Sequence, residues 1–186
     1  MIFIPIILPL IIVFWAIWKY NILVTMKNQV TNAWSQIDIQ LKRRHDLIPN
    51  LVNTVKGYME FEQDTLRQVI QARNAAASAK GVADSAVKEG ELTQLLSRLF
   101  ALVENYPDLK ANENVRTLME ELTSTENTVT FSRQFYNDIT TKFNTSQQTF
   151  PGNLVANMFN FKLAELFEIK NVGEREAPVV NLSMRK

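Results

Sequence analysis

The sequence contains no cysteine and only one histidine, His45, among its 186 residues. Without cysteine the chain forms no disulfide and no thiolate metal site, and it has no cysteine nucleophile. A single histidine removes most zinc sites and most catalysis that relays protons through histidine. These absences exclude several classes of enzyme and metalloprotein.

Strong net charge and phosphate-binding motifs are also lacking. The formal net charge is +1, so no general electrostatic field draws the protein to nucleic acid. The five scattered glycines form neither a Walker motif nor a GxGxxG motif. A di-iron bundle needs Glu-x-x-His motifs, but Lys42 stands three residues before His45. We therefore expect no enzyme activity, no catalytic, cofactor-binding or metal-binding residues, no cofactor, no small-molecule substrate and no nucleic-acid partner.

The longest uncharged run lies near the start of the chain. From Ile2 to Trp18 no side chain carries a charge or an amide. At about 1.5 Å per residue, this run nearly crosses a hydrocarbon layer of about 30 Å. A buried core helix and a cleavable signal peptide are the alternatives, because the run is short and contains Pro5 and Pro9. No basic residue precedes the run and no small-x-small cleavage pattern follows it, which favours an uncleaved membrane anchor.

The residues that follow the run predict its orientation. Lys19, Lys27 and the basic run 42–44 come after it, while Trp15 and Trp18 form an aromatic belt at the same end. Lysine and arginine close to an apolar segment favour the cytoplasmic side. We expect the N-terminus outside and the rest of the chain in the cytoplasm.

Apolar residues beyond the anchor recur about every seven residues, which is typical of helices that pack along one face. The first series is Val30, Trp34, Ile37, Leu41, Ile48, Leu51, Val55, Tyr58, Val69 and Ala72. Pro49 interrupts this series, and a proline inside a helix clashes with the carbonyl four residues back. We predict a helix break at 46–49, with a kink in one long helix as the alternative.

Further along the chain, the stretch 74–90 is rich in small residues, which predicts a frayed helix end and a loop. A third helix is marked by Leu92, Leu95, Leu96, Leu99, Phe100 and Val103, and it ends near Pro107. A fourth begins at Asn112 as N-cap, with Val115, Leu122, Val129, Tyr136, Phe143 and Phe150 at intervals of seven.

These patterns predict an all-α protein, with an N-terminal transmembrane helix followed by an antiparallel up-and-down four-helix bundle with long helices. We divide the chain into an anchor with its interfacial flank (1–24), the helical bundle (25–150), an apolar capping segment (151–169) and a mobile tail (170–186). The capping segment either closes one end of the bundle or contacts a surface or a partner.

Each apolar series marks the packed face of a helix, which we call its seam, and four charged residues fall on these seams. Arg44 and Glu62 continue the first series, and Glu126 and Arg133 lie seven apart on the fourth helix. They form either an ion-pair layer that fixes the register of the helices or a buried proton or ligand site; we favour the ion-pair layer.

The segment from Asn32 to Val52, Asn-Ala-Trp-Ser-Gln-Ile-Asp-Ile-Gln-Leu-Lys-Arg-Arg-His-Asp-Leu-Ile-Pro-Asn-Leu-Val, resembles the signature of the LemA family. Further similarities follow in order at 55–58, 104–112, 118, 122, 125–127, 133, 136–137 and 150–151, while 75–90 departs from the pattern. The resemblance implies a bacterial inner-membrane protein with one anchor and a cytoplasmic four-helix bundle. It implies no activity, since some members are linked with membrane remodelling around organelles and others with envelope stress and membrane metalloproteases.

Two functions from different classes remain open. The first is a scaffold or interaction protein in the lipid bilayer, a homo-oligomer or the partner of another membrane protein, which uses the polar residues Arg43, Asp46 and Asn50. The second is an accessory subunit or uncharacterised enzyme that uses the inward charges of the seams.

Overall fold

The structure, a computed structural model, describes residues 4–168, with side chains from Ile7 onward. The expectation of an all-α protein is confirmed, since the described residues contain helices and no strand. The elements are α1 (Ile4–Val55), the 3₁₀ turn η1 (Glu60–Glu62), α2 (Gln63–Ala77), α3 (Gly81–Val103), α4 (Pro107–Ala111), α5 (Glu113–Gln148) and α6 (Gly152–Met158). The tail predicted as mobile, 170–186, lies outside the described residues.

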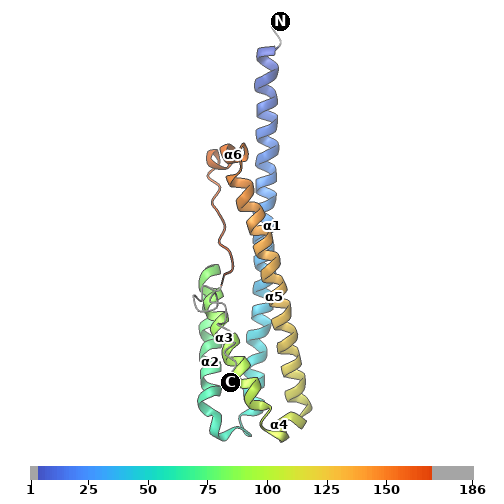
Figure 1. The fold of residues 1–186 in the computed structure, drawn as a ribbon, viewed down its shortest axis with the longest axis vertical. Helices are drawn as coiled ribbons and strands as arrows, with labels where there is room; N and C mark the ends of the chain where they lie inside the picture. The colour runs from blue at the N-terminus through green and yellow to red at the C-terminus, as the bar shows by residue number, and fades with distance from the viewer. Residues whose placement is uncertain (1–3, 169–186) are drawn as a thin grey trace, which may run out of the picture.

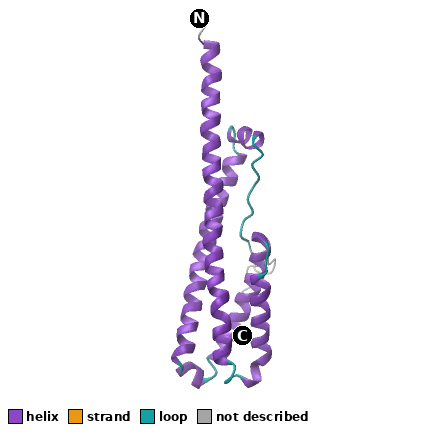
Figure 2. Cartoon of the chain, turned by 180° about the vertical axis from the view of Figure 1, so that it is seen from behind, coloured by secondary structure: helices purple, strands orange, loops and turns teal. Residues whose placement is uncertain are grey.

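The molecule is a rod built on α1, which runs its whole length (Figure 1). α5 packs along α1, while α2 and α3 pack against each other and α2 against α1. Figure 2 shows these helices side by side at the end of the rod opposite the N-terminus. We call this end, with α2, α3, α4 and the facing parts of α1 and α5, the distal region.

The other half of the rod we call the proximal region. It contains residues 19–41 of α1, residues 129–148 of α5, α6, the turn 159–160 and the extended segment 161–168. The extended segment descends from α6 toward the junction of α2 and α3 (Figures 1 and 2). Each region has its own apolar core, with Leu51, Leu92 and Leu99 in the distal core and Leu23, Ile37 and Val129 in the proximal core.

The predicted break at Pro49 is wrong, because α1 continues through this residue to Val55. Proline lacks the N–H that would bond to the carbonyl of His45, four residues back. Arg73 of α2 replaces that donor, since its Nε donates to the oxygen of His45 at 2.8 Å. A neighbouring helix thus satisfies the carbonyl that the proline leaves free, and the helix persists.

The predicted loop over 74–90 is also largely wrong. α2 extends to Ala77 and α3 begins at Gly81, so only three residues connect them. Gly81 has φ +80°, a left-handed conformation that glycine adopts without steric cost. Alanine has the highest helix propensity, and small side chains let helices approach closely, which suits the buried Ala76 and Ala86.

The predicted seams are buried along most of their length, with Ile37, Ile48 and Val129 fully buried. Two members are exposed instead: Tyr58 lies in the turn after α1, and Phe150 lies beyond the end of α5. Met59 takes the buried place next to Tyr58. The predicted N-cap Asn112 is confirmed, because its side chain accepts hydrogen bonds from the N–H groups of Asn114 and Val115.

Candidate functional site

A layer of buried charge crosses the rod where the distal region meets the proximal one. The Arg44 guanidinium donates from Nη1 to Glu89 Oε2 and from Nη2 to Thr93 Oγ1, both at 2.8 Å. The Nε2 of His45 lies 2.6 Å from the other Glu89 oxygen. Glu89 of α3 therefore binds two consecutive side chains of α1.

Glu126 brings α5 into the same layer. Its Oε2 lies 2.7 Å from Arg44 Nη2, an ion pair whose angles are not those of a hydrogen bond. Thr93 Oγ1 donates to the Oε1 of Glu126 at 3.4 Å. Arg44 and Glu89 are 1% and 0% exposed, and buried charges of this kind are tolerated only when they are paired. The charged layer, which we define as Arg44, His45, Glu89, Thr93 and Glu126, thus ties α1, α3 and α5 in one register.

Arg133 lies apart from the charged layer, two turns further along α5. Its guanidinium stacks on the ring of Phe167 at 4.5 Å. Burial lowers the pKa of Arg133, while the carboxylates of Glu126 and Glu89 act in the opposite direction and Arg44 lowers it further. Arg133 therefore contacts the extended segment rather than joining the layer through a short ion pair.

The structure brings together only part of the set predicted from the seams. Arg44 and Glu126 meet, whereas Glu62 ends η1 at the far end of the distal region and does not reach them. The prediction missed Glu89, which lies in the stretch taken for a loop. The sequence did contain a signal for a buried Glu89. This residue lies three positions before Leu92, so it continues the seam of Leu92, Leu96, Leu99 and Val103.

The exposed polar residues Arg43, Asp46 and Asn50 share one side of α1, since positions i, i+3 and i+7 of a helix lie on one face. Arg43 Nη2 faces Glu121 of α5 at 3.8 Å, and Asp46 faces Arg73 of α2 at 3.9 Å. Arg43 and Asp46 reach toward different neighbouring helices from that side, and a docking role for the three residues stays a prediction.

Two clefts adjoin the charged layer. One of about 200 Å³ is lined by Arg44, Thr93 and Glu126, and the other of about 270 Å³ by His45 and Arg73. Within residues 4–168 no group of three or more acidic or histidine side chains could hold a metal ion. The geometry supports helix register first, and it leaves room for a small polar ligand or water beside Glu126.

The exposed side of α5 carries a second candidate site. Its exposed residues over one long stretch bear no charge, and we call them the uncharged face: Thr123, Ser124, Asn127, Thr128, Thr130, Phe131, Gln134 and Phe135. Phe131 is 70% and Phe135 57% exposed. A groove of about 820 Å³ adjoins this face and reaches Leu109 of α4. The outer faces of α2 and α3, in contrast, carry charges such as Arg67 and Arg98.

Comparison with known proteins identifies the family of the chain. The LemA family model matches residues 33–182. The chain belongs to the LemA family. It is 28% identical over 158 residues to protein LemA of Metamycoplasma hominis, which covers 83% of this chain and 72% of that protein.

Other relatives are magnetosome proteins. The chain is 25% identical to magnetosome protein MamQ 2 of Paramagnetospirillum magneticum and 23% identical to MamQ of Magnetospirillum gryphiswaldense, each over 84% of this chain and 67% of the relative. The family and these relatives indicate a membrane-associated helical protein. Among the described residues one helix, α1, is long and apolar enough to cross a membrane. Only 6% of its most apolar 18-residue stretch is buried in the protein.

Proposed function

We propose that this LemA-family chain is a membrane-anchored helical scaffold of the bacterial inner membrane that associates with further copies of itself. The apolar start of α1 spans the bilayer with the N-terminus outside. The distal region lies in the cytoplasm as an antiparallel four-helix bundle of α1, α2, α3 and α5. Neither a cofactor nor a small-molecule substrate is part of the proposal.

The continuity of α1 is the observation that carries the proposal. One helix of 52 residues joins the apolar segment to the far end of the rod, with no loop between them. Most of its apolar side chains from Ile7 to Trp18 are exposed, and buried ones follow from Leu23 onward. An anchor that continues directly into a rod holds the rod upright on the membrane, which suits a spacer or scaffold.

Lysines support the proposed orientation. Lys19 and Lys27 follow the apolar segment on the same helix, and basic residues next to a span favour the cytoplasmic side. The distal region then projects into the cytoplasm.

The uncharged face is the surface that fits a second copy. Two rods anchored in one bilayer stand parallel, so a two-fold axis along the membrane normal brings identical residues to the same height. Like charges opposite each other repel, whereas the aromatic rings of Phe131 and Phe135 attract one another. Unlike the charged outer faces of α2 and α3, the uncharged face meets this requirement.

Absence of cysteine makes the test clean, since a single introduced cysteine is the only thiol in the chain. We compare Thr128→Cys, on the uncharged face, with Gln68→Cys, on the exposed side of α2. Membranes are washed with alkaline carbonate and then oxidised. We expect a disulfide-linked dimer with Thr128→Cys and none with Gln68→Cys. A protein lost in the wash would contradict the anchor, and a Thr128→Cys protein that stays monomeric would contradict self-association.

The charged layer supports a second candidate, an accessory subunit or uncharacterised enzyme. The observation in its favour is the cleft of about 200 Å³ that Arg44 and Glu126 line. Glu126→Gln separates the two candidates. Loss of cellular function with an unchanged melting temperature would favour a ligand site, and a lower melting temperature with retained function would favour the scaffold.

A further inference from the structure

We propose that α6 with its flanking residues, 150–159, is a second membrane contact, which lies in the interface of the bilayer that α1 spans. This inference rests on the proposed anchor and adds a lipid-binding surface to it. The occupant of the surface is lipid, and the contact fixes how deep the short apolar segment of α1 lies.

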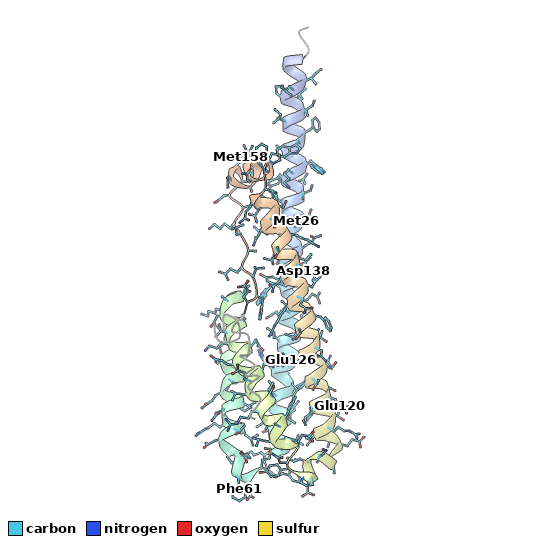
Figure 3. The ribbon with its side chains drawn as sticks, in the orientation of Figure 1. Met26, Phe61, Glu120, Glu126, Asp138 and Met158 are labelled. Atoms are coloured by element: carbon cyan, nitrogen blue, oxygen red, sulfur yellow. The ribbon has the colours of Figure 1, made fainter. Side chains whose placement is uncertain are left out.

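Exposed apolar side chains on α6 are the first observation. Phe150, Leu154 and Met158 are 80%, 56% and 76% exposed, whereas Val155 and Ala156 face the proximal core. Figure 3 shows Met158 at the end of α6, and only α1 extends further toward the N-terminus in the described part of the chain. This element, with its exposed apolar side chains, therefore lies near the inner end of the apolar segment of α1.

Specific contacts hold α6 at the inner end of the apolar segment. The ring of Tyr20 lies 4.6 Å from that of Phe159. Lys19 Nζ donates to Ser146 Oγ at 2.9 Å, at the end of α5. The aliphatic part of Lys19 covers Gly152, where a Cβ would lie 2.6 Å from Lys19 Cε. α6 is thus locked beside the first charged residue after the span, with the ammonium turned toward α5.

The charge pattern agrees with contact to lipid. No residue from Phe143 to Phe161 carries a charge, and exposed lysines frame this stretch at 142 and 162. Its Phe159 and Phe161 lie against Tyr20 of α1, at the end of the uncharged run of that helix. Lysines beside an apolar surface suit the phosphate groups of lipids, and aromatic rings suit the interface itself.

The length of the anchor provides the reason for a second contact. The uncharged run from Ile2 to Trp18 spans about 25 Å at 1.5 Å per residue, less than the roughly 30 Å of a hydrocarbon core. A short span thins the bilayer or draws flanking residues into it, at a cost. Because α6 lies beside Lys19, the first charged residue after this run, its exposed side chains add apolar surface at the inner end of the anchor.

The test measures the depth of single labels in vesicles of phosphatidylethanolamine and phosphatidylglycerol. A fluorescent label is attached to Val13→Cys in the anchor, to Met158→Cys on α6, or to Gln68→Cys on α2. The vesicles carry lipids with a quenching doxyl group near the top of the acyl chain. All three positions are exposed in the folded chain, so the label does not disturb the core.

We expect strong quenching at Val13 and at Met158 and little at Gln68. If Val13 is quenched and Met158 resembles Gln68, the contact of α6 with lipid is refuted while the anchor stands. If neither Val13 nor Met158 is quenched, the anchor fails and the inference fails with it. Quenching at Met158 that is low at high protein density but rises on dilution with lipid would show that another copy covers α6, and would also overturn the inference.

Discussion

The distal and proximal regions share α1 and α5 but differ in what packs against this pair. In the distal region two further helices, α2 and α3, complete the core, and a buried charged layer joins α3 to α1 and α5. In the proximal region the third wall is the extended segment, whose Phe161 and Phe167 pack on the proximal core. The apolar seams of α1 and α5 thus accept a helix or an extended chain as partner.

Two asparagines hold the extended segment. Asn144 donates to the oxygen of Ala164 and accepts from its N–H, at 2.8 and 2.9 Å. Asn137 pairs with Phe167 in the same way, at 3.1 and 2.8 Å. The side-chain amides replace the neighbouring strand that an extended backbone normally needs.

The spacing of these pairs explains why the segment is extended. The two asparagines are seven residues apart on α5, a distance of about 10.5 Å along a helix axis. Ala164 and Phe167 are three residues apart, which is about 10 Å in an extended chain. The two repeats match. Polar side chains therefore set the register in both regions, through charge in the distal one and through neutral amides in the proximal one.

The largest expected effect comes from the charged layer. Glu89→Ala leaves Arg44 and His45 without their buried partner, and we expect a loss of about 3–5 kcal/mol in the free energy of unfolding. Glu91→Ala, on the exposed side of the same helix, is the control and changes it by less than about 0.5 kcal/mol. Denaturant titration followed by circular dichroism measures both. Equal losses in the two variants would show that the layer has no special role.

Removing both asparagine side chains should instead release the extended segment from α5 in the proximal region. We expect Asn137→Ala with Asn144→Ala to destabilise the extended segment by roughly 2–4 kcal/mol, since four hydrogen bonds are lost. Trypsin then cleaves faster at Lys162, and the fluorescence of Trp34, whose ring lies 6.1 Å from that of Phe167, changes. Asn127→Ala, on the exposed side of α5, is the control. Hydrogen exchange that rises around Leu99 of α3, in the distal core, as strongly as near the segment would show that the two cores are not separate.

Within the distal region, variants of Arg73 and Pro49 test whether Arg73 replaces the hydrogen bond that Pro49 cannot donate. Arg73→Ala exposes the free carbonyl of His45 and costs about 1–3 kcal/mol. In a Pro49→Ala background the loss is smaller, because the alanine N–H bonds to that carbonyl. A double-mutant cycle by thermal unfolding measures the difference. Additive effects would mean that Arg73 acts through its contacts with Asp46 and Asn74 and not through the carbonyl of His45.

Tyr136 gives the smallest effect, in the proximal region. Burial raises the pKa of Tyr136, and its hydroxyl donates to the oxygen of Glu165 at 2.7 Å. Because the folded state holds the phenol proton more tightly, this contribution is complete below pH about 10 and falls as the pH rises further. Tyr136→Phe therefore costs about 1 kcal/mol near neutral pH, and less in alkaline solution. A cost that is constant with pH would contradict the assignment.

Much of the fold could be predicted from the sequence, because heptad spacing follows directly from helix geometry. The seams, the N-cap Asn112 and the apolar segment all depend on local pattern. The sequence could not decide between a break and a continuous helix at Pro49, because the outcome depends on Arg73, a residue of another helix. Arg44 and Glu126 of the charged layer were predicted because they lie on recognised seams, whereas Glu89 was missed because it lies in an alanine-rich stretch without large apolar residues.

The extended segment also escaped prediction, since its partners are side-chain amides and no periodic pattern marks them. The role of Asn137 and Asn144 becomes visible only in the structure, where their side-chain amides bond to the backbone of the extended segment.

The most direct test of the account is the distance between spin labels at Ile12→Cys and Gln36→Cys in the full chain reconstituted in lipid vesicles. Both positions are exposed on α1, one in the apolar segment and the other in the rod. A continuous helix places them about 36 Å apart with a narrow distribution. A broad distribution, or a much shorter distance, would show that the anchor and the rod are separate pieces and would contradict the account.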